Sequence, residues 1–162
     1  MRSIRVPALA GMLALAVPAA AEIPISPLSD IYASYNDCFQ VATKGGMKPG
    51  VLQSLGWTRA TTESKDGKVS PNGPTIFGHA TRKPLLLLST ESGEGLCIVA
   101  ARLESGRSFD EFKKAWGGKL PAPDKDGTIS FKAEGQIVQL RRTGSRQEPA
   151  LSIAVMTPMD SE

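Results

Sequence analysis

"LLLLSTESGEGLCIVAARLE" (residues 85–104) contains the two strongest strand signals in the chain and sets the centre of the expected sheet. Two apolar runs, 85–90 and 96–104, are separated by five residues that include two glycines, which is the pattern of a β-hairpin. Both runs are apolar on both faces near their centres. Strands of this kind lie in the middle of a sheet or are covered on both sides.

Weaker strand signals lie on either side of this hairpin. They cover 57–61, 75–81, 128–134, 136–142 and 150–157. The loop-forming segment 63–74 is rich in Gly, Pro, Asp and Asn and separates the first two. Most connections between the strands are too short for the crossover that a parallel sheet requires. We therefore expect a mostly antiparallel sheet.

A first main helix is expected before the strands. Five residues at helical spacing form its apolar stripe: Ile31, Tyr35, Cys38, Phe39 and Ala42. Ser29 is the expected cap, and Gly45-Gly46 is the expected end. Cys38 therefore faces whatever the helix covers. A short second helix is expected over 48–56, with Pro49 near its start.

The clearest helix start in the chain lies after the central hairpin. Ser108 followed by Glu111 is the pattern of a capping box, so a second main helix is expected over 108–118. Its aromatic residues share one stripe, which we expect to pack on the sheet: Phe109, Phe112 and Trp116. The expected fold class is α+β, a mostly antiparallel sheet with two main helices packed on one face.

Residues 1–21, "MRSIRVPALAGMLALAVPAAA", have the pattern of a secretory signal peptide. Two arginines precede an uncharged run over 6–17, and three alanines supply the small side chains that signal peptidase requires. The run is too short to span a bilayer, which takes about 20 residues. We expect cleavage before Glu22, a single domain over 22–162 with no transmembrane segment, and a location in the periplasm or outside the cell.

The charge balance argues against nucleic-acid binding. The leader holds two of the 19 basic residues and none of the 16 acidic ones, so cleavage lowers the formal net charge from +3 to +1. No run of Lys and Arg exceeds two residues, whereas a nucleic-acid footprint needs a clustered basic face. The expected partner is an envelope or extracellular one: another protein, an envelope polymer or a small ligand.

Export also predicts that the two cysteines, Cys38 and Cys97, are bonded to each other. An exported chain enters an oxidising space, and two cysteines allow one intramolecular pairing. Their places on a buried helix stripe and a central strand suit a helix-to-sheet bridge. The competing uses have less support. Cys-x-x-Cys is absent, two cysteines and one histidine do not make a four-ligand zinc site, and a cysteine nucleophile would need His79 as its base.

The motifs that would indicate catalysis or cofactor binding are incomplete. "GEGLCI" (93–98) lacks the third glycine of a dinucleotide-binding loop and joins two strands. Residues 124–127 resemble the start of a calcium loop, but the positions after Gly127 do not continue the pattern. His79 is the one candidate catalytic residue. Three arginines at strand ends form a candidate anion site: Arg102, Arg141 and Arg142.

These observations favour an exported domain that acts by binding rather than by catalysis and uses neither cofactor nor metal. Two alternatives stay open. The first is a small hydrolase that uses His79 with a hydroxyl or carboxylate, in which His79→Ala would cost orders of magnitude in rate. The second is an inhibitor or immunity protein for a secreted enzyme, which would be recovered from the native host in a tight 1:1 complex.

Overall fold

The computed structural model describes residues 23–43, 46–60, 74–89 and 95–157. The helices are α1 (Leu28–Val41), α2 (Pro49–Ser54) and α3 (Gly106–Lys113), and α3 continues into a 3-10 turn, Lys114–Trp116. The strands are β1 (Ala42–Thr43), β2 (Gly46–Met47), β3 (Trp57–Arg59), β4 (Thr75–His79), β5 (Leu85–Ser89), β6 (Leu96–Arg102), β7 (Thr128–Ala133), β8 (Gln136–Gly144) and β9 (Pro149–Met156). No described helix is long and apolar enough to cross a membrane.

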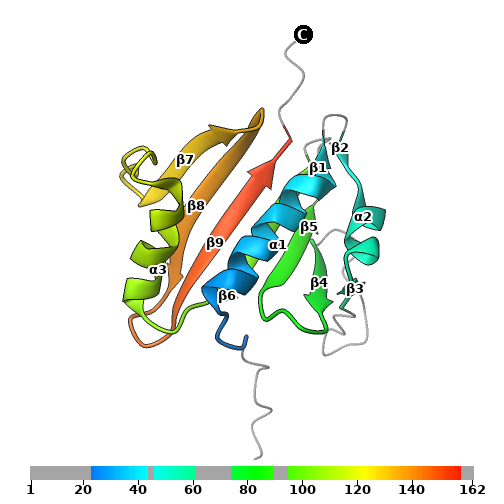
Figure 1. Ribbon diagram of the computed structural model, residues 1–162, viewed down its shortest axis with the longest axis horizontal. Helices are drawn as coiled ribbons and strands as arrows, with labels where there is room; N and C mark the ends of the chain where they lie inside the picture. Colours follow the sequence, from blue (N-terminus) through cyan, green and yellow to red (C-terminus); the bar gives the residue numbers. More distant parts are fainter. Residues whose placement is uncertain (1–22, 44–45, 61–73, 90–94, 158–162) are drawn as a thin grey trace, which may run out of the picture.

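Seven of these strands form one antiparallel sheet in the order β3-β4-β5-β6-β9-β8-β7 (Figure 1). The expected central hairpin pairs β5 with β6 and places Leu88 opposite Cys97. Both strands lie in the middle of the sheet, as their apolar faces predicted. The tip of this hairpin (90–94), residues 61–73, which include most of the expected loop, and residues 1–22, which include the expected leader, lie outside the described residues.

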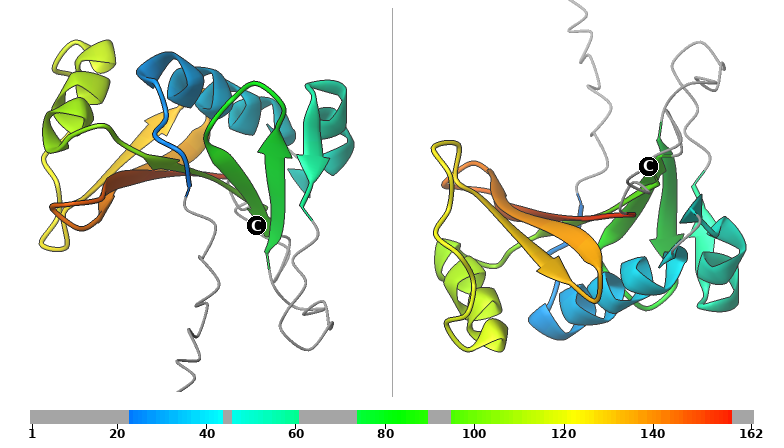
Figure 2. Two further views of the ribbon diagram at one scale, coloured as in Figure 1. Left: turned by 90° about the horizontal axis from the view of Figure 1, so that it is seen from below. Right: turned by 90° about the horizontal axis from the view of Figure 1, so that it is seen from above.

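All three helices lie on one face of the sheet, and the sheet bends around α1 (Figure 2). The antiparallel sheet with helices on one face agrees with the α+β prediction, although the sheet dominates the molecule and α2 is a third, short helix. The core fills the space between α1 and this face. Buried residues alternate along β6, β9 and β8 and face this space: Val99, Leu151, Ile153, Val155, Val138 and Leu140.

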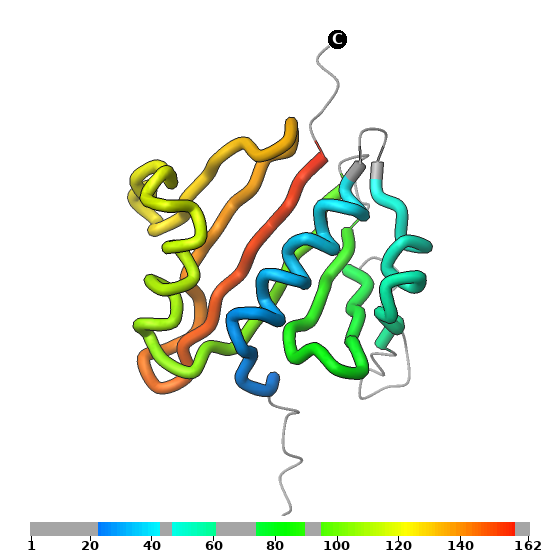
Figure 3. The backbone as a smooth tube through the Cα atoms, viewed as in Figure 1, coloured from blue at the N-terminus to red at the C-terminus, as the bar shows by residue number. Residues whose placement is uncertain are grey.

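The chain enters the sheet before it enters α1. Ile25 forms a parallel bridge with Arg102 at the end of β6, and the Ser26 N–H donates a 2.8 Å hydrogen bond to the Arg102 carbonyl. The chain then passes onto the helix face, where α1 begins at Leu28 (Figure 3). The predicted cap at Ser29 is wrong. Pro27 holds the cap position, and its side chain has no hydrogen-bonding atom, so its contribution is the φ that its ring fixes before the first turn.

The predicted ends of two helices also need correction. α1 ends at Val41, and Gly46 begins a two-residue strand that pairs with β1 instead of ending the helix. α3 begins at Gly106 rather than after Ser108. Ser105 is its cap, and Ser105 and Ser108 bond to each other's backbone N–H in a capping box that does not use Glu111.

The aromatic stripe of α3 packs on the sheet as predicted, although its three residues are buried to different extents. Phe109 and Phe112 are buried on the sheet, and Trp116 is half-buried because it lies in the 3-10 turn. Trp116 closes a chain of ring contacts between α3, α1 and β7. Its ring centroid lies 5.2 Å from that of Phe112, 5.9 Å from that of Tyr35 and 5.8 Å from that of Phe131.

Candidate functional site

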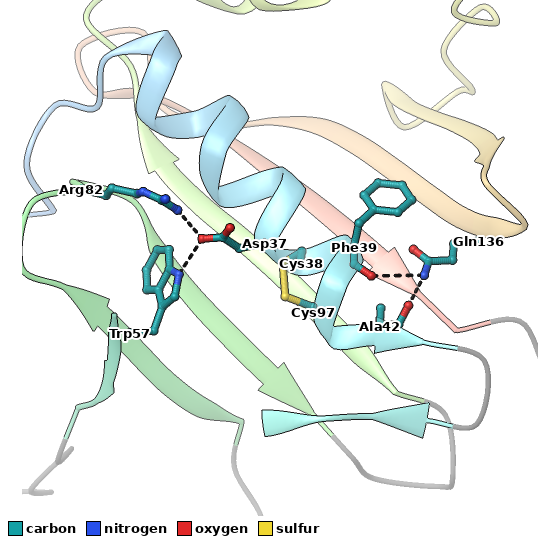
Figure 4. The surroundings of a disulfide bond; sticks show 8 residues. All are labelled: Asp37, Cys38, Phe39, Ala42, Trp57, Arg82, Cys97 and Gln136. Atoms are coloured by element: carbon teal, nitrogen blue, oxygen red, sulfur yellow. Dashed lines mark hydrogen bonds and ion pairs between the residues drawn. A yellow bond between two sulfur atoms is a disulfide. The ribbon is translucent and has the colours of Figure 1, made fainter. Parts of the chain in front are cut away.

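The two cysteines lie where the pairing was predicted, at disulfide geometry in the core. Cys38 of α1 and Cys97 of β6 have Cα atoms 5.6 Å apart, and both side chains are fully buried (Figure 4). The bridge fixes the middle of α1 to the centre of the sheet. It spans 59 residues, so it restricts a large part of the unfolded chain.

A buried carboxylate lies beside this bridge. Asp37 is 4% exposed, and its Oδ2 accepts a 2.8 Å hydrogen bond from Trp57 Nε1 and pairs with the Arg82 guanidinium. Burial of a carboxylate is tolerated when donors and a cation satisfy it. The sequence reasoning missed Asp37, although its position three residues after Ser34 places both on the buried side of α1.

His79, the candidate catalytic residue, has both ring nitrogens engaged. Nε2 lies 3.1 Å from the Leu55 carbonyl, and Nδ1 lies 3.2 Å from the backbone N–H groups of Thr81 and Arg82. A carbonyl accepts and an N–H donates, so these partners require the neutral tautomer with its proton on Nε2. The ring also packs edge-on against Trp57. In this state His79 links the end of α2 to the segment after β4.

The three candidate anion-binding arginines do not form one site. Arg102 forms an ion pair with Glu148 at 3.4 Å. Arg141 and Arg142 are neighbours on β8, so they point to opposite faces of the sheet. Arg142 lies on the helix face, with its guanidinium carbon 5.9 Å from the ring centroid of Phe109. Arg141 lies on the other face, opposite Ser152 of β9.

The face of the sheet turned away from the helices carries an unusual apolar surface, which we call the open face. No described helix or strand lies over it (Figure 2). Its cross-strand neighbours run from β4 to β9 in one row of paired residues: Ile76, Leu87, Ile98 and Ala154. Leu85, Leu96, Ala100 and Met156 extend the surface on either side of that row. An antiparallel sheet with one solvated face normally has polar residues there.

The open face becomes polar and basic towards β8 and β7. The row that begins at Ile76 ends in Gln139 and Ser130, and the neighbouring rows end in Lys132 and in Arg141 with Thr128. Among these residues all but Thr128 are exposed. The surface is therefore mostly apolar over the central strands and mostly polar and basic over β8 and β7, with Ile137 of β8 as an exposed apolar residue between Met156 and Lys132.

A groove lies at one end of this surface, which we call the open-face groove. Its volume is about 420 Å³, within the range of sites that hold small ligands. It is lined by Ile23, Ala100, Ala101, Arg102, Thr143, Glu148, Ala150, Leu151 and Ser152. Small side chains from β6 and β9 form its floor, and the Arg102–Glu148 pair and two hydroxyls form its polar part. The first described residue, Ile23, forms part of its wall.

No other feature of the described chain assigns a function. The described residues bring together no three His, Cys, Asp or Glu side chains that could hold a metal ion. Comparisons with protein-family models, with curated proteins and with solved structures found no match. The open face and its groove are therefore the candidate functional site, on the geometry of this chain alone.

Proposed function

We propose that the protein is an exported binding protein that holds an amphiphilic molecule on its open face. The ligand has one aliphatic chain and one acidic headgroup, as in a long-chain fatty acid. The observation that carries this proposal is the open-face groove, whose small apolar floor runs into an uncovered apolar surface over β5 and β6. Export is supported by the leader pattern in 1–21 and by the disulfide-bonded cysteines.

The apolar part of the site supports an aliphatic chain. Ala100 lines the groove and pairs with Leu85, and the neighbouring pair Leu87–Ile98 continues the apolar surface away from it. Each methylene that leaves water for such a surface contributes about 0.8 kcal/mol. The side chains of this surface are half-buried, and a contiguous apolar patch that is left accessible on a folded domain is typical of an interaction site.

The charges around the groove support an acidic headgroup. Arg102 lines it, and Arg141 lies opposite the lining residue Ser152 on the same face. Glu148 is the one carboxylate among the lining residues and pairs with Arg102. Arg141 is exposed and is paired across the strands with Ser152, so we assign its guanidinium to the carboxylate of the ligand.

A second copy of the chain fits this face less well. Two open faces packed together would each contribute Lys132, Arg141 and Arg102 and would offer Glu148 as an acid. Such a contact would bury like charges with too few partners, which disfavours association. An amphiphile instead matches both the apolar surface and the excess of positive charge beside it.

The proposal is tested with the chain from Glu22 onward and a fluorescent fatty acid, dansyl-aminoundecanoic acid. We expect saturable 1:1 binding with a blue-shifted emission and displacement by octanoate, decanoate and dodecanoate. Affinity should rise roughly tenfold for every two methylenes until the surface is filled. Arg141→Gln should weaken decanoate binding about threefold, as for an exposed charge pair, and should leave decanol binding unchanged.

Two variants with the same added charge locate the site. Ala100→Glu places a carboxylate in the groove and should weaken binding at least about tenfold. Ser130→Glu places one on the same face but on the edge strand β7, away from the groove lining, and should not weaken binding. Ala150→Met fills the groove with an apolar side chain and should also weaken binding. It tests the site even if Ala100→Glu does not fold. Three outcomes would each refute the proposal. They are equal effects of Ala100→Glu and Ser130→Glu on binding, the absence of saturable binding, and a stable dimer that covers the open face.

Export is tested separately, by intact-mass analysis of the protein recovered from the native envelope fraction. The expected mass is that of a chain beginning at Glu22. A product that retains residues 1–21 would remove the support for export and leave the binding measurements unaffected.

A further inference from the structure

A second cavity lies at the turn between β8 and β9, next to the open-face groove, with which it shares the lining residue Thr143, and its charged residues are cations. Its volume is about 510 Å³, and we call it the arginine cavity. It is lined by Gly106, Arg142, Thr143, Gly144, Ser145, Arg146 and Pro149. We propose that the arginine cavity binds a phosphate or sulfate group, in a site distinct from the open-face groove.

Arg142 is placed in this cavity by close contact with the start of α3. Its guanidinium lies over the Phe109 ring, and one of its terminal nitrogens occupies the space that a side chain at position 106 would need. Gly106 therefore allows the guanidinium to lie directly against the backbone. A guanidinium held in this way loses less freedom on binding an oxyanion than one extended into solvent.

Arg146 reaches the cavity from the tight turn between β8 and β9. The Ser145 N–H donates to the Glu148 carbonyl at 3.1 Å, and the Glu148 N–H donates to Ser145 Oγ at 3.0 Å. Gly144 has a φ of 76°, and a side chain there would collide with the Glu148 carbonyl, so the turn depends on glycine at this position. Because Ser145 Oγ accepts from Glu148, its own proton is available to donate to an anion in the cavity.

The described chain supplies no counter-ion to this pair. No carboxylate lines the cavity, and among the described residues neither Arg142 nor Arg146 forms an ion pair. Glu148, the acid of the turn, pairs with Arg102 instead. The first turn of α3 contains no acid and includes Arg107. Two guanidinium forks and a hydroxyl around one cavity form a donor set that matches the several oxygens of a phosphate or sulfate group.

The test is calorimetric titration of the chain from Glu22 onward in chloride buffer, with inorganic phosphate, inorganic sulfate and phenyl phosphate. We expect 1:1 binding of at least one of them, weakened by added salt. Tighter binding of phenyl phosphate than of inorganic phosphate would identify a phosphate carried on a larger molecule. The reverse order would identify the free anion. Failure to bind all three would overturn the proposal.

Variants assign the binding to the two arginines. Arg142→Gln and Arg146→Gln should each weaken binding about tenfold, as for the loss of one charge-assisted hydrogen bond, whereas Arg59→Gln, an exposed residue of β3, should stay within twofold. Arg146 makes no packing contact with a ring in the described structure, so its variant tests the site even if Arg142→Gln is unstable. An Arg146→Gln variant that binds as tightly as the parent chain would overturn the proposal.

Anion binding in the arginine cavity should not depend on amphiphile binding in the open-face groove. Ala100→Glu, which blocks the open-face groove, should bind phosphate normally, and Arg146→Gln should bind the fluorescent fatty acid normally. Loss of phosphate binding in Ala100→Glu would show that the two cavities are not separate sites. This outcome would overturn the proposed anion site and would leave the proposed amphiphile site standing.

Discussion

The indole Nε1 of Trp57 donates a 2.8 Å hydrogen bond to the buried carboxylate of Asp37, the residue directly before the disulfide-bonded Cys38. The same carboxylate pairs with Arg82 from the segment that follows β4. One side of α1 is thus attached to the sheet by a covalent bond and the adjacent side by a charged hydrogen-bond network. The two attachments reach different parts of the sheet, because Cys97 lies in β6, the central strand, and Trp57 lies in β3 at one edge.

Removal of this carboxylate should destabilise the fold. Asp37→Ala is expected to lower the free energy of unfolding by about 3 kcal/mol, because it leaves the Trp57 N–H and the Arg82 guanidinium without their acceptor. Asp37→Asn keeps one acceptor oxygen and should cost less. Urea denaturation measures both. The control is Asp110→Ala, an exposed acid paired with Lys113, which should change the free energy by less than about 1 kcal/mol. Similar losses at positions 37 and 110 would contradict the assigned role.

The disulfide should contribute about as much to stability as one of the largest buried side chains of the core. Cys38→Ala and Cys97→Ala are each expected to lower the free energy of unfolding by about 4 kcal/mol in the chain-entropy model. The double variant should resemble either single one, because all three lack the same bond. Free-thiol titration of denatured, unreduced protein should detect none. Two reactive thiols in protein isolated without reductant would contradict the pairing and would return a cysteine-based activity to consideration.

The two tyrosines should titrate later than tyrosine in an unfolded chain. Burial, and then the nearby Glu134 carboxylate, raises the pKa of Tyr35 from 10.0 to about 12, and burial raises the pKa of Tyr32. The folded state therefore keeps protons that the unfolded state releases, so stability is complete below pH 10 and falls between about pH 10 and 12. Absorbance at 295 nm should show the Tyr35 transition near pH 12 in Tyr32→Phe. A transition near pH 10 in that folded variant would contradict the burial of Tyr35.

The packing of α3 on the sheet is tested by two neighbouring residues. Phe112 is fully buried, so Phe112→Ala should lower the free energy of unfolding by about 3–5 kcal/mol. Lys113 is half-buried, with its ammonium 2.9 Å from Asp110 on the outside of the helix, and Lys113→Ala should cost less than about 1 kcal/mol. Thermal and urea denaturation measure the difference. Equal losses would mean that α3 is rotated about its axis from the described orientation.

The centre of the fold was predictable from the sequence because one local pattern determines it. The apolar runs around Cys97 are too short and too uniformly apolar for an edge position, and the glycine-containing turn between them requires an antiparallel pair. The start of α3 was not predictable in the same way. Ser105 and Ser108 both precede helix-forming residues, and which of them is the cap depends on the extended backbone at Ser105.

The candidate sites were harder to predict, for two different reasons. Arg141 and Arg142 are adjacent residues of a strand, so the alternation of side chains alone shows that they cannot share a site, and this signal was present in the sequence. The open-face groove had no such signal. It forms where Ile23 meets residues 100–102 and 148–152, and contacts between segments so far apart in the chain leave no local pattern.

The bridge between Ile25 and Arg102 has a practical consequence for any attempt to immobilise the protein. Anything joined to the chain upstream of Ile23 starts at the wall of the open-face groove, so an N-terminal affinity tag or surface linkage would compete with the proposed ligand for the same space. The described chain ends after β9 at Thr157, which pairs with Gly95 at the far end of β6. Capture through the C-terminal side would therefore present the groove to solution, and a binding assay that fails with one orientation should be repeated with the other.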